Sequence, residues 1–349
     1  MSVFPAGSAA AREPRESPGG GDPRPTEGVA AGMGRRYQAG IAGTRMAIPM
    51  ASWNGQNRSE QPMRAWLSSW ARRRRLGPPK RVGLALGGGF ARGIAHIGVL
   101  EVLEQEGVPI DMIAGTSSGS LVAAAYASGL RPQQIAEAAS QLRLRDVGRW
   151  TLSKLGLASN VRMEVYLRRL LACTEFEKMR IPLLIPATNL NTGDITVFRS
   201  GSVLDAIRAS CAYPLMYQPV KIDGAYYVDG GLICVVPAEP LREAGADFII
   251  SVELGGRWTG AVPHNMLEVL GQSFAIAVMA HAGRWRRISD VLIEPQVDDY
   301  AHDAFDRYQE LIEAGRAATR AALPKLRELL RGRLAAEPAP AAAVTAAGT

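Results

Sequence analysis

The sequence predicts an α/β sandwich built on a largely parallel sheet. From Arg81 onward, short apolar runs with the length of buried strands alternate with longer segments of helical periodicity. Strands that are separated by helices need crossover connections, and such connections pair strands in parallel. The strands themselves are almost wholly apolar, which is typical of a sheet covered by helices on both faces.

The predicted elements follow one another in a regular order. The first strand is expected at 82–86, and the first helix at 94–105, with Gly107 as its stop signal. Further strands are expected at 110–114, 183–189, 194–198, 248–252 and 291–293. Further helices are expected at 121–127, 133–144, 161–171, 265–284, 304–320 and 325–334.

Composition divides the 349-residue chain into three regions. Residues 1–79 form an arm rich in Gly, Pro, Ser, Ala and Arg, and it is predicted to be disordered because it buries too little apolar surface. Residues 80–334 form the folded domain, and the Ala/Pro-rich tail 335–349 is again predicted to be disordered. The arm carries twelve arginines and five acidic residues, which accounts for the whole net charge of +7. The rest of the chain is therefore formally neutral.

Within the arm, residues 62–76 have a different character. Trp66 and Trp70 run into the cluster Arg72-Arg73-Arg74-Arg75. Tryptophans beside arginines suit an interfacial helix on an anionic lipid surface. A short helix that packs its tryptophans on the domain and leaves its arginines in water fits the segment equally well.

Several partners and compartments are disfavoured. Nucleic acid is not expected as a partner, because the folded domain has no excess of positive charge. Cys173, Cys211 and Cys234 lie far apart and form no disulfide pattern, which fits a reducing compartment. The sequence has no secretory signal and no apolar run of about 18 residues, the length of a membrane span. We therefore expect a cytoplasmic protein without metal or cofactor, with peripheral attachment to the inner face of a membrane as an option for the arm.

Gly115-Thr116-Ser117-Ser118-Gly119 is the most informative motif. It lies between the predicted strand 110–114 and a helix of small apolar residues. A serine on a tight strand-to-helix turn exposes its hydroxyl at the positive end of a helix dipole, and flanking glycines relieve the crowding. We expect Ser117 to be a nucleophile, although a Gly/Ser-rich turn that only ends a strand would have the same pattern.

A glycine loop, Gly87-Gly88-Gly89-Phe90-Ala91-Arg92-Gly93, follows the first strand directly. Consecutive glycines at a strand-to-helix junction let several N–H groups converge on one negative group. Such a loop can bind a nucleotide phosphate or serve as an oxyanion hole. The nucleotide alternative is weaker, because Arg92 replaces the last glycine of the dinucleotide fingerprint and Asp111 precedes the serine turn.

A nucleophile also needs a general base. Asp229 stands on a glycine turn after a short apolar stretch, as ordinary turn aspartates often do. His264, His281 and His302 follow it, so the order Ser, Asp, His of a triad is available. His96 lies on the first helix and is expected to pack there. The residues alone leave open whether an aspartate or a histidine is the base.

The chain resembles the patatin-like phospholipases. Four motifs agree in order and spacing: Gly87-Gly88-Gly89-x-x-Arg92-Gly93, Gly115-x-Ser117-x-Gly119, Ser210-Cys211-Ala212-Tyr213-Pro214 and Asp229-Gly230-Gly231. The resemblance covers residues 81–295 approximately and looks closest to compact bacterial members, related to the neuropathy-target-esterase type of catalytic domain. It implies a three-layer α/β/α sandwich with a mostly parallel central sheet, and a Ser117–Asp229 dyad without a catalytic histidine.

The resemblance also implies an activity and a substrate. The expected enzyme is a hydrolase of acyl-ester lipids, of phospholipase A or lysophospholipase type, that needs no cofactor. The implied roles are an oxyanion hole at Gly87, Gly88, Gly89 and Arg92, a nucleophile turn at Gly115 and Gly119, and a turn for Asp229 at Gly230 and Gly231. Arg92 is expected either to add positive charge or to brace the loop. Segments 145–180 and 266–280 are candidate walls for the acyl chain or ordinary packing. The alternative from another class is a noncatalytic lipid-binding scaffold recruited to membranes.

Overall fold

The computed structural model describes residues 81–331, except 144, 145, 147, 154, 256–261 and 265. The predicted arm 1–79, its candidate helix 62–76 and the tail 335–349 lie outside the described residues. Within the described part, no helix combines the length and the apolar character that crossing a bilayer requires.

A mixed eight-stranded sheet forms the centre of the fold. Its strands run in the order β10-β9-β1-β2-β5-β8-β7, and β6 also pairs with β5. The strands are β1 (Val82–Leu86), β2 (Met112–Gly115), β5 (Leu183–Asn189), β6 (Ile195–Phe198), β7 (Val220–Ile222), β8 (Ala225–Asp229), β9 (Phe248–Val252) and β10 (Val291–Ile293). A separate antiparallel hairpin joins β3 (Arg149–Ser153) to β4 (Gly156–Ser159).

The sheet has a parallel part and an antiparallel part. The five strands β10, β9, β1, β2 and β5 pair in parallel. Beyond β5 the pairing changes, since β6 and β8 run antiparallel to β5, and β7 antiparallel to β8. The carboxyl ends of parallel strands are where such sheets place their functional loops. The loops after β1 and β2 therefore open at the same edge.

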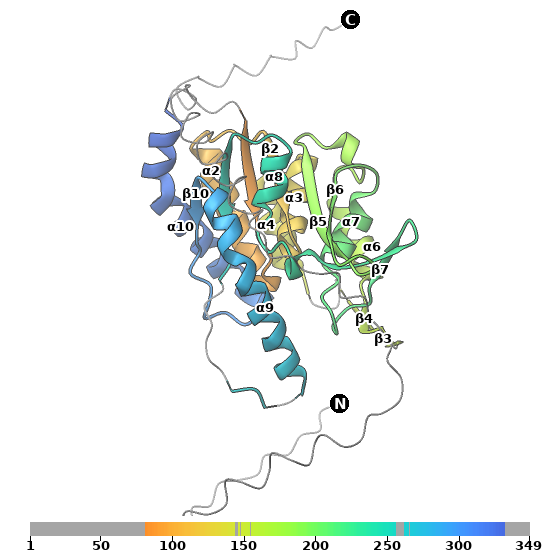
Figure 1. The fold of residues 1–349 in the computed structure, drawn as a ribbon. Coiled ribbons are helices and arrows are strands. Elements are labelled where there is room, and N and C mark those ends of the chain that lie inside the picture. Colours follow the sequence, from red (N-terminus) through yellow and green to blue (C-terminus); the bar gives the residue numbers. More distant parts are fainter. Residues whose placement is uncertain are drawn as a thin grey trace, which may run out of the picture. The chain divides into compact units, whose positions relative to one another are not determined.

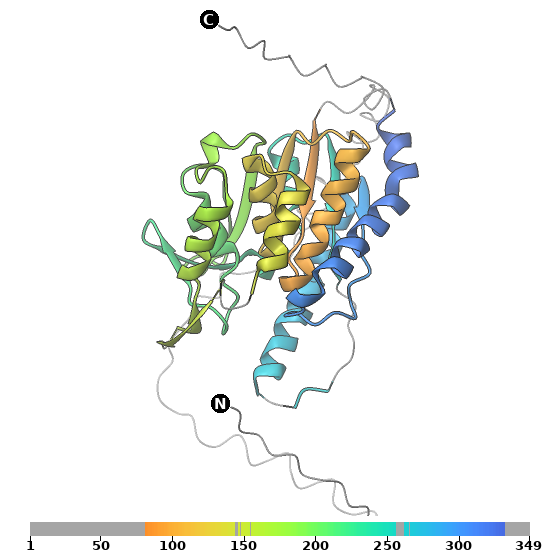
Figure 2. The ribbon, with the colours of Figure 1, turned by 180° about the vertical axis from the view of Figure 1, so that it is seen from behind.

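Helices cover both faces of the sheet, which gives three layers. One face carries η1 (Phe90–Ile94), α2 (Ala95–Gln105), α3 (Ser118–Ser128), α4 (Pro132–Gln141), α6 (Val161–Leu170), α7 (Val203–Ser210) and α10 (Tyr308–Leu329). The other face carries α8 (Ala238–Glu243) and α9 (Met266–Ile288). Figure 1 shows α8 and α9 in front of the sheet, and Figure 2 shows α2, α3 and α10 over the opposite face. The three-layer α/β/α sandwich that the resemblance implies is confirmed.

Strand β1 shows how the sequence distributes its side chains between the layers. Val82, Leu84 and Leu86 point to the face of α2 and α3, where they are fully buried. Ala85 points to the other face, against α8. A side chain at Gly83 would also meet Leu241 of α8, with its Cβ 3.2 Å from a methyl carbon. Small residues on one face and large ones on the other let α8 pack closely.

Helices α2 and α10 pack against each other through two glycines. A Cβ at Gly98 would lie only 1.9 Å from the Ile312 carbonyl oxygen, and a Cβ at Gly315 only 1.9 Å from that of Ala95. Arg316 also pairs with the buried Glu101. The start of α2, which directly follows the glycine loop, is thereby fixed to the C-terminal helix.

Most predicted elements are found, with some shifts and one clear error. The strands 82–86, 183–189, 248–252 and 291–293 agree with β1, β5, β9 and β10, while β2 begins two residues later than expected. The helices predicted at 304–320 and 325–334 are in fact one helix, α10, which continues through Pro324. A proline inside a helix costs about 3 kcal/mol. Leu323 and Leu326, on either side of it, are buried on the same helix face, and this packing offsets the cost.

The antiparallel strands β7 and β8 were not predicted, nor were α7, α8 and the β3–β4 hairpin. A signal for β7 and β8 is present in the sequence. Asp223 and Gly224 connect them with φ angles of 47° and 86°. Asp-Gly with two positive φ angles is a favoured two-residue hairpin turn.

Candidate active site

Ser117 occupies a strained turn between β2 and α3. Its backbone has φ 51° and ψ −124°, a conformation that costs a non-glycine residue free energy and that marks functional turns. The neighbouring glycines allow this turn. A Cβ at Gly115 would lie 2.3 Å from the Gly119 carbonyl oxygen, and a Cβ at Gly119 would lie 2.3 Å from that of Leu86. The turn therefore accepts no side chain at either position.

Asp229 ends β8 and is buried, with 4% of its surface exposed. Its carboxylate accepts a hydrogen bond from the Gly231 N–H at 2.7 Å. Burial raises the pKa of Asp229 to about 6, although the Gly231 N–H and the nearby Ser117 hydroxyl lower it. The carboxylate is thus a stronger base than an exposed aspartate and is still ionised at neutral pH.

The sheet brings these two residues together across more than a hundred positions of sequence. Strand β5 pairs in parallel with β2, which leads to Ser117, and antiparallel with β8, which ends at Asp229. Gly230 lies so close to β5 that a Cβ there would be 2.4 Å from the Pro186 carbonyl oxygen. The turn of Asp229 therefore needs glycine at this position.

The third motif, Ser210 to Pro214, connects both functional residues. Ser210 is fully buried, and its Oγ accepts a hydrogen bond of 2.9 Å from the Ser117 N–H. The Ala212 carbonyl accepts one of 3.0 Å from the Asp229 N–H. Ser210 was not among the predicted site residues, and its presence in a shared motif was the only signal for it.

The glycine loop lies beside the nucleophile. A Cβ at Gly88 would be 3.3 Å from the Ser117 Cβ. The N–H groups of Gly87 and Gly88 donate to the carbonyls of Val252 and Val235, each at 3.0 Å. Within the described chain, the N–H groups of Gly89 and Ser118 have no carbonyl acceptor. The first two glycines thus set the course of the loop, while the N–H groups of Gly89 in the loop and Ser118 in the turn keep their donor capacity.

The Arg92 guanidinium contacts the segment 298–300. Its Nε and Nη2 donate to the carbonyls of Tyr300 and Asp298, both at 2.9 Å. Partial burial lowers the pKa of Arg92, and the charges of Asp298 and Asp299 oppose this shift. Arg92 therefore braces the segment 298–300 against the loop. Since the guanidinium is bound to these two carbonyls, the contacts support a structural role of Arg92 and not a charge directed at an oxyanion.

The histidines make other contacts. His96 is fully buried and its Nε2 donates to the Gly87 carbonyl at 2.8 Å. The His302 ring packs edge-on against Phe90, with centroids 5.5 Å apart. Desolvation and then the charge of Arg92 lower the pKa of His302. His264 lies in an exposed segment, and the side chain of His281 is outside what the structure describes.

Cys211 adds a thiol to the same cluster. Its Sγ lies 3.8 Å from the Ser120 Oγ. Burial and the nearby charge of Asp229 raise the pKa of this thiol. A neutral thiol is a poor nucleophile, so Cys211 does not compete with Ser117.

The chain is similar to known patatin-like and NTE family proteins. Residues 84–242 match the family model described as patatin-like phospholipase. An uncharacterized NTE family protein of Mycobacterium bovis is 37% identical over 183 residues, which are 52% of this chain and 51% of that protein. Lysophospholipase NTE1 of Scheffersomyces stipitis is 26% identical over 266 residues, 67% of this chain but only 17% of that protein. The chain thus spans about half of one relative and a small part of the other.

Among solved structures, VipD from Legionella pneumophila matches with a TM-score of 0.42 and 13% identity. The match covers 71% of this chain and 67% of VipD. The glycine loop and the nucleophile turn, together with the start of the Asp229 turn, all fall within residues 84–242. By the family match and its NTE family relatives, the chain contains a patatin-like phospholipase domain.

Proposed function

We propose that this chain hydrolyses acyl esters of lipids, as a phospholipase A or lysophospholipase, with Ser117 as nucleophile and Asp229 as general base. The observation that carries the proposal is the strained turn of Ser117 next to the buried Asp229 carboxylate, whose pKa the Ser117 hydroxyl lowers. A relative of the chain is named a lysophospholipase, which supports the substrate class.

In the acylation step, Ser117 Oγ attacks the ester carbonyl carbon while its proton moves to the Asp229 carboxylate. The tetrahedral intermediate then collapses. The bond to the alcohol breaks, Asp229 returns the proton to the leaving oxygen, and Ser117 carries the acyl group. The raised pKa of Asp229 suits it to both transfers.

The intermediate needs donors for its negative oxygen. The N–H groups of Gly89 and Ser118 are free for this purpose, and they lie in the loop and the turn that meet at Ser117. The residue after a nucleophile on such a turn commonly supplies one oxyanion donor. Each donor of this kind lowers the activation free energy by about 3 kcal/mol. Gly87, Gly88 and Arg92 then hold the loop in place rather than donate.

In the deacylation step, a water molecule attacks the acyl-serine. Asp229 accepts one proton from this water, the second tetrahedral intermediate forms against the same donors, and its collapse releases the fatty acid. The proton on Asp229 returns to Ser117 Oγ. The cycle is balanced without any group other than substrate, water and these side chains.

Activity-based labelling tests the proposal. A fluorophosphonate should label the wild-type protein at Ser117, as mapped by mass spectrometry of the modified peptide, and Ser117→Ala should remain unlabelled. Turnover of p-nitrophenyl butyrate should fall by on the order of 10⁴-fold or more in Ser117→Ala and Asp229→Asn. Lipidomic comparison of substrates before and after incubation would then identify the bond that is cleaved.

The same assays separate the alternatives. A noncatalytic scaffold would show no turnover above the Ser117→Ala background. A histidine-dependent esterase would lose its activity when His264, His281 and His302 are replaced together. We expect this triple variant to retain most of its turnover, because the Ser117 hydroxyl lies near enough to Asp229 to lower the pKa of its carboxyl.

We also propose that the enzyme meets its substrate at a lipid surface. Leu155 and Leu157 are 63% and 48% exposed, and the backbone of Leu157 pairs with that of Leu215, whose side chain and that of Met216 are 38% exposed. Exposed apolar patches of this kind mark interaction sites. Sedimentation with phosphatidylcholine vesicles should weaken in the double variant Leu155→Asp, Leu157→Asp. Unchanged sedimentation would contradict this part of the proposal.

A further inference from the structure

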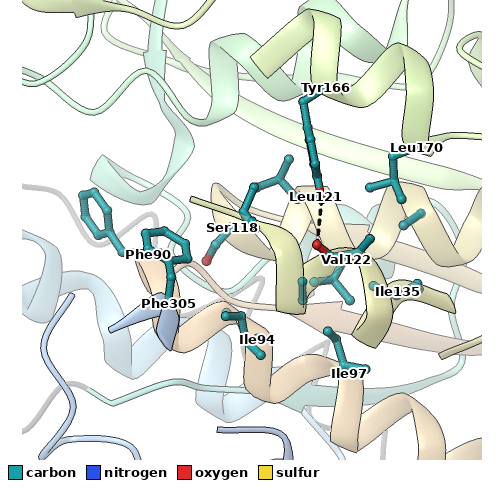
Figure 3. A pocket seen from close by; sticks show the side chains of 15 residues that line it. Phe90, Ile94, Ile97, Ser118, Leu121, Val122, Ile135, Tyr166, Leu170 and Phe305 are labelled. Carbon is teal, nitrogen blue, oxygen red and sulfur yellow. Dashed lines mark hydrogen bonds between the residues drawn. The ribbon is translucent and has the colours of Figure 1, made fainter. Parts of the chain in front are cut away.

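A second pocket, with charged and apolar side chains in its lining, lies away from the candidate active site. Its volume is about 380 Å³. Ligand pockets commonly have volumes of roughly 300–1,000 Å³. The apolar pocket between α2, α3 and α4 that Figure 3 shows holds only about 70 Å³. Of the two, the second pocket is therefore the one with room for a small organic ligand.

The pairing of the strands places this pocket at one edge of the sheet. Arg81 directly precedes β1, Met112 is the first residue of β2, and Leu183 is the first residue of β5. These strands run in parallel, so their amino ends share an edge. Arg199 reaches the same edge because it follows β6, which runs antiparallel to β5. Ser117 lies beyond the other end of β2, about 16 Å of extended chain away from Met112.

The floor of the pocket is apolar and firmly packed. Met112, Leu183 and Leu184 belong to the central sheet and have 1%, 3% and 5% of their surface exposed. Phe176, in η2 (Phe176–Lys178), is also buried and lines the pocket. Side chains that are held in the core and still line a pocket offer apolar surface that a ligand covers without rearranging the protein. Such a floor suits a short alkyl or aryl group.

Two arginines lie at the rim of the pocket, and both are exposed. In the part of the chain that the structure describes, the Arg199 side chain has no hydrogen-bond or ion-pair partner. Arg81 donates one hydrogen bond of 3.3 Å to the Ala244 carbonyl. Guanidinium groups with unused N–H donors bind acidic oxygens in pairs. The rim therefore favours a ligand with an acidic group.

Glu177 adds a negative charge to the lining. Its carboxylate already accepts a hydrogen bond of 2.9 Å from the Gly201 N–H. This bond lowers the pKa of Glu177, so the carboxylate is ionised at neutral pH. Two arginines and one glutamate leave the lining with a net charge of +1. A single acidic group balances this charge, whereas a polyanion would exceed it.

We propose that this pocket binds a small monoanionic amphiphile, with its acidic head at Arg81 and Arg199 and its apolar part on the floor. A medium-chain carboxylate has this chemistry, and so does the fatty acid that the proposed reaction releases. The site is separate from the candidate active site. Binding at this site does not depend on the proposed hydrolase activity.

Isothermal titration calorimetry of the full-length protein with octanoate tests the inference. Wild-type protein should bind octanoate at least about 10-fold more tightly than acetate, because each methylene buried on the floor strengthens binding about fourfold. It should bind 1-octanol at least about 10-fold more weakly than octanoate, because the alcohol cannot form charge-assisted hydrogen bonds with the arginines.

Three variants locate the bound octanoate. Arg199→Gln removes the unpaired guanidinium and should weaken octanoate binding by about 10-fold. Ala244→Leu adds a branched side chain at a half-buried position of the lining and should weaken binding without any change of charge. Arg169→Gln, at an exposed position of α6, removes the same charge elsewhere and should bind octanoate like the wild type. The melting temperature of each variant is the control for folding.

The outcomes are distinct. An octanoate affinity that stays at the wild-type value in both Arg199→Gln and Ala244→Leu places the ligand elsewhere, such as the candidate active site, and overturns the inference. Equal affinities for octanoate and 1-octanol overturn it as well, because the arginines would then contribute nothing. The same holds if the wild-type protein does not bind octanoate. Since the titration needs no turnover, its result is independent of whether the protein hydrolyses esters.

Discussion

The imidazole Nε2 of His96 lies 2.8 Å from the carbonyl oxygen of Gly87, the first residue of the glycine loop. The carbonyl can only accept, so Nε2 carries the proton, and Nδ1 is buried without a hydrogen-bond partner. Burial lowers the pKa of His96 to about 4, although the bond to Gly87 acts against this shift. At neutral pH the neutral His96 on α2 therefore fixes the glycine loop through its hydrogen bond to the Gly87 carbonyl.

This contact predicts that His96 positions the oxyanion loop. His96→Phe removes the donor and leaves a buried carbonyl unpaired, which costs about 1–3 kcal/mol. We expect kcat for p-nitrophenyl butyrate to fall by about 10-fold or more with little change in KM, and His96→Gln, which keeps a donor, to recover part of the loss. A purely structural role would instead lower the melting temperature of His96→Phe and leave kcat of the folded fraction at the wild-type value.

The pKa of Asp229 predicts the pH dependence of the reaction. The base must be ionised, and burial raises its pKa to about 6. We expect kcat/KM to rise with pH through about 6 and then to level off. His96 should not contribute to this limb, because it stays neutral above about pH 4. The profile is measured with p-nitrophenyl butyrate, and a limb that vanishes in His302→Gln would assign it to a histidine instead.

The same pKa predicts a gain of stability in the inactive variant. Because the folded pKa of Asp229 is raised, the folded state binds this proton more tightly than the unfolded state, whose aspartate has a pKa of about 3.9. The favourable contribution is complete below the unfolded pKa and is lost as pH rises through about 6. Asp229→Asn should therefore raise the free energy of unfolding by about 1–3 kcal/mol at about pH 8, and by little at about pH 4.

Urea unfolding at both pH values measures this difference. Asp194→Asn, at an exposed turn, is the matched control and should change stability little at either pH. A loss of stability in Asp229→Asn at the higher pH would show that the carboxylate, even ionised, holds the fold together.

The close packing of α2 against α10 predicts a strong effect of one methyl group. Gly315→Ala would place its Cβ 1.9 Å from the Ala95 carbonyl oxygen, so the two helices must separate. We expect a loss of at least about 1 kcal/mol in the free energy of unfolding. Gly283→Ala is the control, because its Cβ would meet only the end of the Arg287 side chain at 3.6 Å. There the higher helix propensity of alanine should add about 0.5–1 kcal/mol. Equal effects of the two substitutions would contradict the packing argument.

The strands of the sheet centre were predictable because burial on both faces leaves a local trace. Strands β1, β5, β9 and β10 are nearly continuous apolar runs, and their bounds agree with the prediction. The prediction of two separate helices on either side of Pro324 was wrong, because here packing between distant elements decided the structure. Intrinsic propensity favours an end there, but Leu323 and Leu326 pack on the core and α10 continues. Such tertiary packing leaves no signal that is local to the proline.

The candidate site likewise combines local features, which the sequence predicts, with contacts between distant segments, which it does not. Ser117 was predicted from its strand-to-helix turn, which is a local feature, whereas Asp229 was preferred over a histidine only through the resemblance to the patatin-like phospholipases. The sequence did not show which glycine N–H groups of the loop already have a carbonyl acceptor. Gly87 and Gly88 donate to carbonyls of residues that lie more than 140 positions away in sequence, Val252 and Val235. The function of Arg92 as a brace likewise depends on the distant segment 298–300.

The sequence by itself determined the α/β class, the order of the central elements and the turn that carries Ser117. These depend on periodicity and on turn geometry, which act over a few neighbouring residues. Only the tertiary structure decided that His96 holds the Gly87 carbonyl, that Ser210 and Ala212 bind the backbones of Ser117 and Asp229, and that Arg81 and Arg199 line one pocket. Each of these contacts joins separate elements, and their distances are set by how the sheet pairs and how the helices pack on it.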